Sequence, residues 1–292
     1  MKNPGFAGAI PFVAPLLLLA SIGLSQAQPA SGMDTCGTVM VVETHDNSTT
    51  RYAFVPPPEN EQQQSRITVL LLPGGSGHVN LDDKACPRAL KGNSLVRSIP
   101  IFNASGFGTA LLDAPSDFQG EDGLAGFRSA SQHAVDIGKV IADLRRRTQG
   151  SVWVVGTSRG SISAANAAAR LSGPAAHDGV VLTSALMSGQ SAAKKTWVAQ
   201  TVFDLPLEAI RQPLLLIGHA ADRCVRSPPD AMEKVTARTR GVRQQVVTIA
   251  GGPAYDGPPG INACEGRSPH GFVDQEAEVV AGIARFIRGE KF

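Results

Sequence analysis

Apolar residues along this chain follow two alternating patterns. Short, nearly continuous apolar runs predict buried strands at residues 66–75, 109–115, 151–155, 179–185, 213–218 and 244–251. Spaced apolar positions between the runs predict helices at residues 94–106, 131–147, 160–171, 229–240 and 273–288. Two earlier runs, "GTVMVVETHD" and "TTRYAFVPP", predict a leading antiparallel pair. Strands that alternate with helices indicate an α/β fold, with a mostly parallel twisted sheet of about eight strands and helices on both faces.

The start of the chain has a different character. A basic residue is followed by the apolar stretch "FAGAIPFVAPLLLLASIGL" and then by the small residues Ser25 and Ala27. This order predicts a secretory signal peptide over residues 1–27, which leaves residues 28–292 as a single domain. A retained membrane anchor is the alternative, but two prolines interrupt the apolar stretch. We therefore expect an exported protein, periplasmic or secreted, with no membrane span in the mature chain.

The four cysteines agree with export. They are Cys36, Cys86, Cys224 and Cys264, and no two have the spacing of a CxxC metal or redox motif, so we expect no metal site. In an oxidising compartment four cysteines predict two disulfides. Three pairings exist, and we favour Cys36–Cys86 with Cys224–Cys264; four free thiols are the alternative.

The charge of the chain predicts little about partners. A formal net charge of +2 gives no reason to expect a polyanion. The cluster Arg145-Arg146-Arg147 lies at the end of a predicted helix, where cations interact favourably with the helix dipole. We therefore expect no nucleic-acid partner, and the sequence does not indicate an oligomeric state.

One segment, "SVWVVGTSRGSISAANAAARL", carries the strongest chemical signal. Ser158 lies between Gly156 and Gly160, directly after a predicted strand and before a helix of small residues. The bare pattern G-x-S-x-G is weak, but strand, turn and helix are the context that a nucleophile elbow requires. The helix start also directs backbone N–H groups toward the place where an oxyanion would form. A simple glycine turn is the alternative interpretation.

A serine nucleophile needs a base and an orienting acid. Asp222 follows the strand "PLLLIG", and His270 lies in the loop "RSPHGF" between the last strand and the last helix. Because reactive groups gather at the carboxyl ends of parallel strands, we expect both near Ser158. The alternatives are His45, His78, His133, His177 and His219 for the base and Asp178, Asp204, Asp256 and Glu265 for the acid. Asp113 and Asp117 are better explained as organisers of their own loop.

Five motifs in this order resemble the α/β-hydrolase family over residues 66–290. They are "LLLPGGSG", "GFGTALLDAPSD", "GTSRG", "LLLIGHAAD" and "SPHGF". The resemblance implies an exported, bacterial-type serine esterase with Ser158, Asp222 and His270 as its triad and no cofactor. It also implies an oxyanion hole from the backbone N–H groups of Gly75 and Arg159, with Ser76 as the alternative to Gly75. The family commonly has histidine where this chain has Pro73.

The substrate is less clearly indicated. Only about 27 residues separate two late strands, which predicts no large lid and an open site for a small-molecule ester. Phe118, Phe127 and Arg128 are candidate pocket residues, although their loop could equally be a glycine-rich surface loop. Arg97 and Arg159 suit either an acidic substrate or structural ion pairs. The alternative functions are a peptidase or thioesterase on the same triad and a non-catalytic binding protein.

Overall fold

The computed structural model describes residues 1, 2, 5 and 8, and then residues 35–59, 66–190, 195–239 and 241–292. The chain separates into the units Met1–Met33 and Asp34–Phe292, and the description below concerns the second unit. Apart from four positions, the predicted signal peptide over residues 1–27 lies outside the described residues. None of the helices in the described part is both long and apolar enough for a membrane span.

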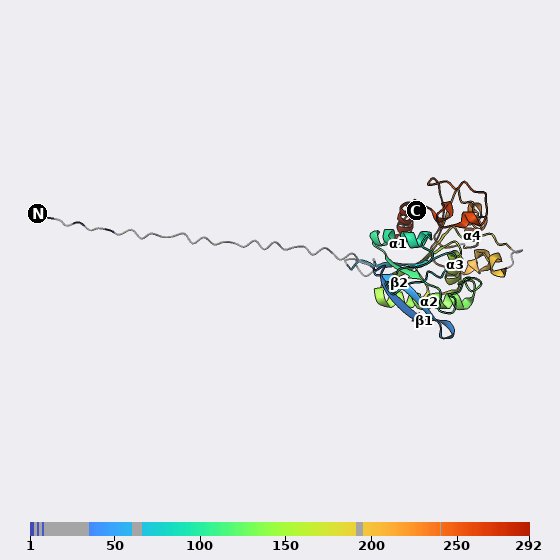
Figure 1. Ribbon diagram of the computed structural model, residues 1–292, viewed down its shortest axis with the longest axis horizontal. Helices are drawn as coiled ribbons and strands as arrows, with labels where there is room; N and C mark the ends of the chain where they lie inside the picture. The colour runs from blue at the N-terminus through green and yellow to red at the C-terminus, as the bar shows by residue number, and fades with distance from the viewer. Residues whose placement is uncertain (3–4, 6–7, 9–34, 60–65, 191–194, 240) are drawn as a thin grey trace. The chain divides into compact units, whose positions relative to one another are not determined.

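The described part of the second unit contains one eight-stranded sheet (Figure 1). Its strands are β1 (Thr38–Glu43), β2 (Thr49–Val55), β3 (Ile67–Leu72), β4 (Gly108–Leu112), β5 (Ser151–Thr157), β6 (Gly179–Thr183), β7 (Leu214–His219) and β8 (Gln244–Ile249). Their order across the sheet is β1-β2-β4-β3-β5-β6-β7-β8. β1 with β2 and β2 with β4 are antiparallel, and every other pair is parallel. The mostly parallel α/β sheet is therefore confirmed.

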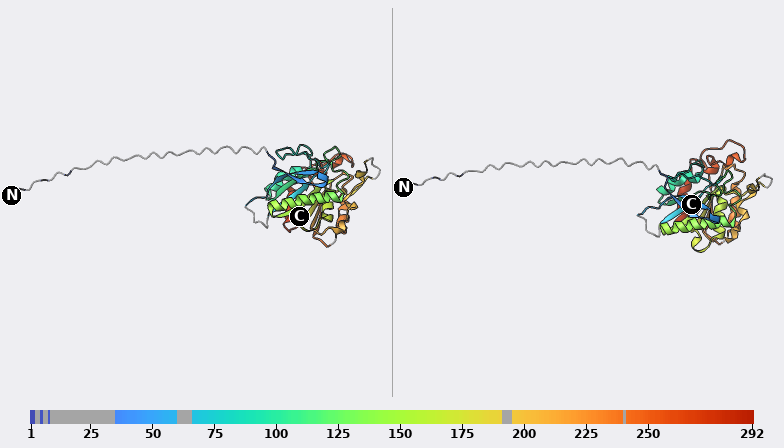
Figure 2. Two further views of the ribbon diagram at one scale, coloured as in Figure 1. Left: turned by 90° about the horizontal axis from the view of Figure 1, so that it is seen from below. Right: turned by 60° about the horizontal axis from the view of Figure 1, so that its bottom comes forward.

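Helices cover both faces of this sheet. One face packs against α1 (Ser94–Ala104) and α5 (Glu276–Ile287), and the other against α2 (Ser131–Thr148), α3 (Gly160–Arg170) and α4 (Met232–Arg238). Figure 1 shows α1 and α2 on opposite sides, and Figure 2 shows the yellow-green α2 lying along the sheet. Alternate side chains of β3 divide between the faces, because successive residues of a strand point in opposite directions. Leu70 and Leu72 join the core on the α2 side, and Val69 and Leu71 the core on the α1 side.

The arginine cluster at the end of α2 is structural. Arg146 and Arg147 pair with Asp143 one turn earlier, and Arg145 pairs with Asp178. α2 ends at Thr148, and the next residue, Gln149, has a left-handed conformation and donates its N–H to the Arg145 carbonyl. The cluster thus terminates α2, as the sequence predicts.

Several predicted elements end earlier or begin later than expected, and left-handed residues explain two of these differences. β6 ends at Thr183 because Ser184 has a φ of 43°. α5 begins at Glu276 because Phe272 and Asp274 have φ values of 51° and 60°, which no helix accommodates. The helix expected over residues 229–240 divides into a 3-10 turn and α4. The 3-10 turns of the described residues are His45–Asn47, Gly173–Ala175, Thr196–Ala199, Val202–Asp204, Leu207–Ala209, Pro229–Ala231, Asn262–Cys264 and Pro269–Gly271.

Candidate active site

Ser158 occupies the sharp turn between β5 and α3. Its φ of 51° lies in the left-handed region, which a serine seldom adopts and which indicates a turn held by its surroundings. Its backbone N–H donates to the Thr183 carbonyl at 3.0 Å. Its own carbonyl accepts a hydrogen bond from the Ser161 hydroxyl at 2.6 Å. These bonds fix the turn and leave the Ser158 side chain on a cavity.

The glycines around Ser158 allow three elements to approach closely. A Cβ on Gly156 would lie 2.7 Å from the Cβ of Ala164 in α3. One on Gly160 would overlap the Leu72 carbonyl oxygen, and one on Gly74 would lie 2.9 Å from the Ser158 Cβ. Side chains at these positions would push β3, β5 and α3 apart. The glycine spacing is therefore required by packing as well as by the turn.

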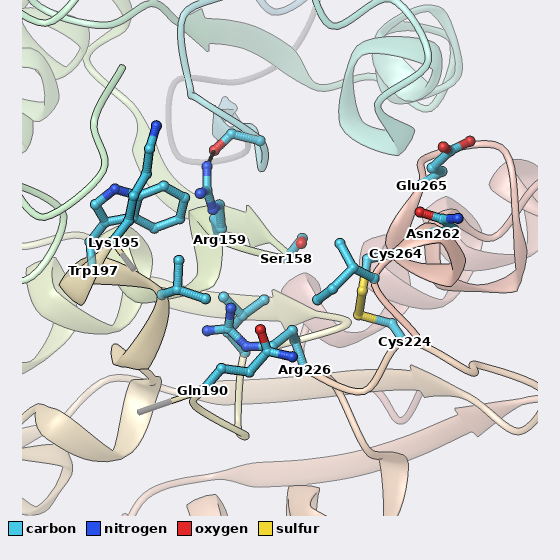
Figure 3. Close-up of a pocket in the computed structure, with 14 residues that line it drawn as sticks. Ser158, Arg159, Gln190, Lys195, Trp197, Cys224, Arg226, Asn262, Cys264 and Glu265 are labelled. Atoms are coloured by element: carbon cyan, nitrogen blue, oxygen red, sulfur yellow. Dashed lines mark hydrogen bonds between the residues drawn. A yellow bond between two sulfur atoms is a disulfide. The ribbon is translucent and has the colours of Figure 1, made fainter. Parts of the chain in front are cut away.

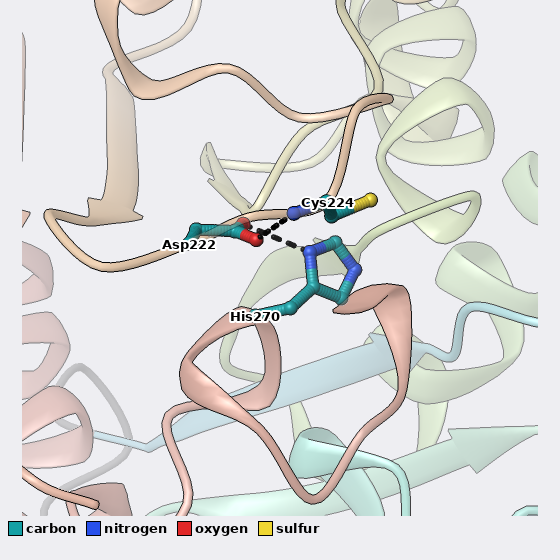
Figure 4. Close-up of side chains that lie close together, drawn as sticks. All are labelled: Asp222, Cys224 and His270. Atoms are coloured by element: carbon teal, nitrogen blue, oxygen red, sulfur yellow. Dashed lines mark hydrogen bonds and ion pairs between the residues drawn. The ribbon is translucent and has the colours of Figure 1, made fainter. Parts of the chain in front are cut away.

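His270 and Asp222 form a buried pair at the same edge of the sheet (Figure 4). The His270 Nδ1 lies 2.9 Å from the Asp222 Oδ2, and the two side chains are 3% and 1% exposed. The second oxygen of Asp222 accepts the Cys224 N–H at 2.8 Å, and the His270 carbonyl accepts the Ser184 hydroxyl at 2.6 Å. The Asp222 carboxylate is thus held by a backbone N–H of its own loop and the His270 backbone by Ser184, which together with the bond between the two side chains fixes the ring orientation.

The other ring nitrogen of His270, Nε2, is buried and is not engaged by a neighbouring group of the described residues. His270, Ser158 and Gly75 together line a cavity of about 280 Å³. No direct hydrogen bond joins Ser158 to His270 within the described part of the chain, so the structure brings them to one cavity without closing the contact.

Asp222, Cys224 and His270 also have the residue types of a metal site, but their chemistry does not suit one. Their potential ligand atoms lie within 4.8 Å of one another. The Cys224 sulfur, however, is bonded to Cys264, so it cannot act as a thiolate ligand. The Asp222 oxygens are already engaged by His270 and by the Cys224 N–H. This donor set is that of a carboxylate–imidazole pair.

Two backbone N–H groups beside Ser158 are free to bind an anion. Those of Gly75 and Arg159 donate no hydrogen bond among the described residues, and both residues line a cavity with Ser158. Ser76 lines neither of the two cavities at Ser158, and its carbonyl oxygen accepts the Leu124 N–H. The geometry therefore favours Gly75 over Ser76.

A larger cavity of about 580 Å³ also borders Ser158 (Figure 3). Its lining comes mainly from the β6–β7 segment and from the two loops that the Cys224–Cys264 disulfide joins. The sequence analysis missed Gln190, Lys195, Trp197 and Arg226 in this lining. They lie in loops and short turns without hydrophobic periodicity, and the only available signal was their position after the carboxyl ends of β6 and β7.

Two guanidinium groups lie on this cavity. Arg159 donates to the Gly75 carbonyl at 2.9 Å and stacks 3.8 Å from the centre of the Trp197 ring. Burial, together with the nearby charge of Arg226, lowers the pKa of Arg159 to about 10. Arg226 is itself buried, and burial lowers its pKa as well. Both groups remain cationic at neutral pH.

Three residues expected at the pocket lie elsewhere. The expectation that Phe118, Phe127 and Arg128 bind substrate is corrected, because none is among the lining residues of either cavity at Ser158. The Phe118 and Phe127 rings stack with centroids 4.2 Å apart and pack on His45. Arg128 is buried and donates to the Pro73 carbonyl. Their loop folds inward as part of the scaffold.

The other charged candidates have structural partners. Arg97 pairs with Glu276 and donates to three carbonyls, so it is an ion pair rather than a pocket residue. Asp113 accepts the N–H groups of the loop after β3, as expected of a loop organiser. The remaining histidines are engaged or buried elsewhere. His45 is bonded to Asp136 and Asp117, His78 to Asp113, His133 to Ser163 and His219 to Gln275, and His177 is buried.

The structure contains two disulfides, Cys36–Cys86 and Cys224–Cys264, the pairing favoured from the sequence. The second borders the large cavity and joins the loop of Asp222 to the turn that precedes His270. The first ties the start of β1 to the loop after β3, away from the cavity lining. Only one of the two disulfides therefore touches the site.

Comparison with known proteins identifies the architecture. No family model and no curated protein matches the sequence. Among solved structures, the esterase Est2 of Thermogutta terrifontis is 14% identical, with a TM-score of 0.55 over 88% of this chain and 94% of that one. The esterase Pf2001 of Pyrococcus furiosus is 13% identical, with a TM-score of 0.56 over 88% and 94%. The chain has the α/β-hydrolase fold. Within this fold, the carboxyl edge of the sheet is followed by the loops that carry Ser158, Asp222 and His270, which come after β5, β7 and β8.

Proposed function

We propose that this chain is a serine hydrolase that cleaves carboxylic esters. One observation carries the proposal: His270 is anchored by Asp222 through Nδ1, its Nε2 has no hydrogen-bond partner among the described residues, and the residue lines a cavity together with Ser158. A histidine with one nitrogen oriented and the other free is arranged to take a proton from a hydroxyl. The esterases with similar folds support the same reaction class, although they share only about one residue in seven with this chain.

In this mechanism the substrate carbonyl sits beside Ser158. The His270 Nε2 takes the Ser158 proton as the oxygen attacks the carbonyl carbon, and Asp222 stabilises the imidazolium that forms. The Gly75 and Arg159 N–H groups bind the oxyanion of the tetrahedral intermediate. The imidazolium then protonates the alcohol, which leaves behind an acyl-Ser158. Water enters by the same route and releases the acid.

The cavity dimensions support a small substrate. A volume of about 580 Å³ falls within the usual range for pockets that hold small molecules. Apolar lining residues, among them Leu186, Val198 and Ile261, suit the carbon chain of an ester. The β6–β7 segment forms only short 3-10 turns where it is described, so it supplies one wall rather than a large lid.

Purified protein assayed with p-nitrophenyl acetate, butyrate and octanoate, and with aminoacyl p-nitroanilides, tests the reaction class. We expect ester hydrolysis with little anilide cleavage. Ser158→Ala and His270→Gln should each reduce kcat by at least about a thousandfold, whereas the exposed Ser172→Ala serves as the matched control. Full activity in Ser158→Ala, or preferred cleavage of the anilides, would overturn the proposed reaction.

Export is the second part of the proposal. Residues 1–27 act as a signal peptide, and the two disulfides suit an oxidising compartment such as the periplasm or the extracellular space. We expect a mature N-terminus near Gln28 when the full chain is expressed in a bacterial host. Mass spectrometry of the periplasmic and culture fractions measures this directly. Recovery only of the uncleaved chain would contradict it.

A further inference from the structure

The cavity beside Ser158 carries more positive charge than ester cleavage alone requires. Arg159 and Arg226 both line it, and neither has a carboxylate within ion-pair distance among the described residues. Given the proposed esterase function, on which this inference rests, we propose that the substrate ester bears a carboxylate that binds to Arg159 and Arg226. The natural substrates would then be monoesters of dicarboxylic acids or esters of hydroxy acids.

Arg226 is the more constrained of the two. Its side chain is almost fully buried, because the residue is 6% exposed, yet it is part of the cavity wall. Nε donates to the Ser188 carbonyl at 2.5 Å and Nη2 to the Gln200 carbonyl at 3.1 Å. Within the described residues these neutral carbonyls are its only hydrogen-bond partners, and Nη1 donates to none. A buried cation that keeps a donor free on a cavity is a site for an anion.

Arg159 presents its guanidinium to the same space. The Arg159 guanidinium lies over the Trp197 ring, which orients it. Its Nη1 donates a hydrogen bond to the Gly75 carbonyl. Burial and then the charge of Arg226 lower the pKa of Arg159, while the carboxylate of Asp122 acts in the opposite direction. Since no ion pair joins either guanidinium to a carboxylate among the described residues, the repulsion between the two cations is only partly offset. An anion bound at this position would relieve that repulsion. Guanidinium groups favour carboxylates because two parallel N–H donors match two oxygens.

The other charges of the cavity leave this end positive. The charge of Lys195 is compensated by its ion pair with Asp122, so this residue adds little positive charge to the cavity. Glu265 is the acidic residue of the lining, and Figure 3 shows it on the opposite side of Ser158 from Arg159 and Trp197. Ser158 thus lies between a cationic wall and an acidic rim. A substrate with one anionic end would bind in a single direction across the nucleophile.

Two pairs of esters test the inference in the wild-type protein. The first compares p-nitrophenyl hydrogen adipate with p-nitrophenyl methyl adipate, which carries the same acyl chain with its carboxylate capped. The second compares 4-carboxyphenyl butyrate with 4-(methoxycarbonyl)phenyl butyrate, which puts the carboxylate on the alcohol side. After division by the spontaneous hydrolysis rates, we expect kcat/KM to favour the carboxylate in one pair by at least about tenfold. Preference for the capped ester in both pairs, or no preference in either, would overturn the inference.

Variants then assign the preference to Arg226. Arg226→Gln should reduce the ratio of kcat/KM for the charged ester to that for the capped ester by about tenfold or more. Arg285→Gln, which removes one exposed charge from α5, is the matched control and should leave the ratio unchanged. An equal ratio in Arg226→Gln and wild type would contradict the assignment.

A second measurement does not depend on the folding of the variant. Adipate should inhibit the wild-type protein competitively and at least about tenfold more strongly than dimethyl adipate, with the difference reduced at high salt. Equal inhibition by the two would refute the carboxylate site. Failure of this inference is distinguishable from failure of the esterase proposal. If the wild-type protein hydrolyses the capped esters and Ser158→Ala does not, the esterase proposal is retained. This holds even if every ratio of kcat/KM for a charged ester to that for its capped partner is near one.

Discussion

The Cys224–Cys264 disulfide offers a test of how the acid and base loops are held. Cys224 lies two residues after Asp222, and Cys264 six residues before His270. The bond closes a loop with a sequence separation of 40. In the chain-entropy model, removing it by Cys224→Ser with Cys264→Ser lowers the free energy of unfolding by about 4 kcal/mol. The same change frees the loop that positions Asp222 against the His270 ring.

The second disulfide supplies a matched control. Cys36–Cys86 has a sequence separation of 50, so its removal by the corresponding double serine variant also costs about 4 kcal/mol in the same model. It borders neither cavity at Ser158. The two variants should therefore lose similar stability and differ in catalysis.

Urea unfolding at 15 °C and kcat for p-nitrophenyl butyrate, measured where each variant is fully folded, separate these effects. We expect both variants to show lower urea midpoints, and only the Cys224/Cys264 variant to lose about tenfold or more in kcat, as a misplaced catalytic group does. Equal kcat in the two folded variants would refute the argument that this disulfide positions the site. Unchanged midpoints in both would refute the entropic estimate.

Two further predictions concern packing and pH. Gly160→Ala should destabilise the fold by about 1–3 kcal/mol in urea unfolding, because its Cβ would overlap the Leu72 carbonyl. Gly138→Ala is the control, because its Cβ would meet only side-chain atoms, of Leu171 at 3.1 Å and of Ala175 at 3.3 Å; equal midpoints for the two variants would contradict the packing argument. Burial lowers the pKa of His177 to about 4, so the unfolded chain binds more protons below pH 6.5 and stability falls as the pH falls. His177→Leu should remove about 2 kcal/mol of the stability loss between pH 7 and pH 5; an unchanged pH slope would show that His177 is not responsible.

The central strands of the sheet could be predicted because they are buried on both faces. The sequence of β5, which has six buried residues, is consistent only with a strand buried in the middle of a sheet. Its position in the sheet order, between β3 and β6, depends on pairings that no local pattern encodes. Element ends were less accurate where single residues take left-handed conformations, as Ser184 and Phe272 do, since side-chain type gives little indication of a positive φ there.

The residues proposed as nucleophile, acid and base could be selected from the sequence because each follows a strand or a recognisable turn. The residues of the cavity wall could not be selected in this way. Trp197 and Arg226 come from irregular segments whose paths are set by long-range contacts, such as the bonds from Arg226 to the Ser188 and Gln200 carbonyls. The same limitation explains the error at Phe127. An aromatic residue after a strand suits a pocket, but its ring packs on His45, 82 positions earlier in the chain (127 − 45).

The central claim is that Ser158 is a nucleophile activated by His270. Reaction of the folded protein with a fluorophosphonate, followed by peptide mass spectrometry, measures this most directly, because the reagent bonds covalently only to an activated serine. We expect one adduct, on Ser158, that forms at least about a hundredfold more slowly in His270→Gln and not at all in Ser158→Ala. Absence of label in the folded wild-type protein, or a label on Ser158 that forms equally fast in His270→Gln, would contradict the claim.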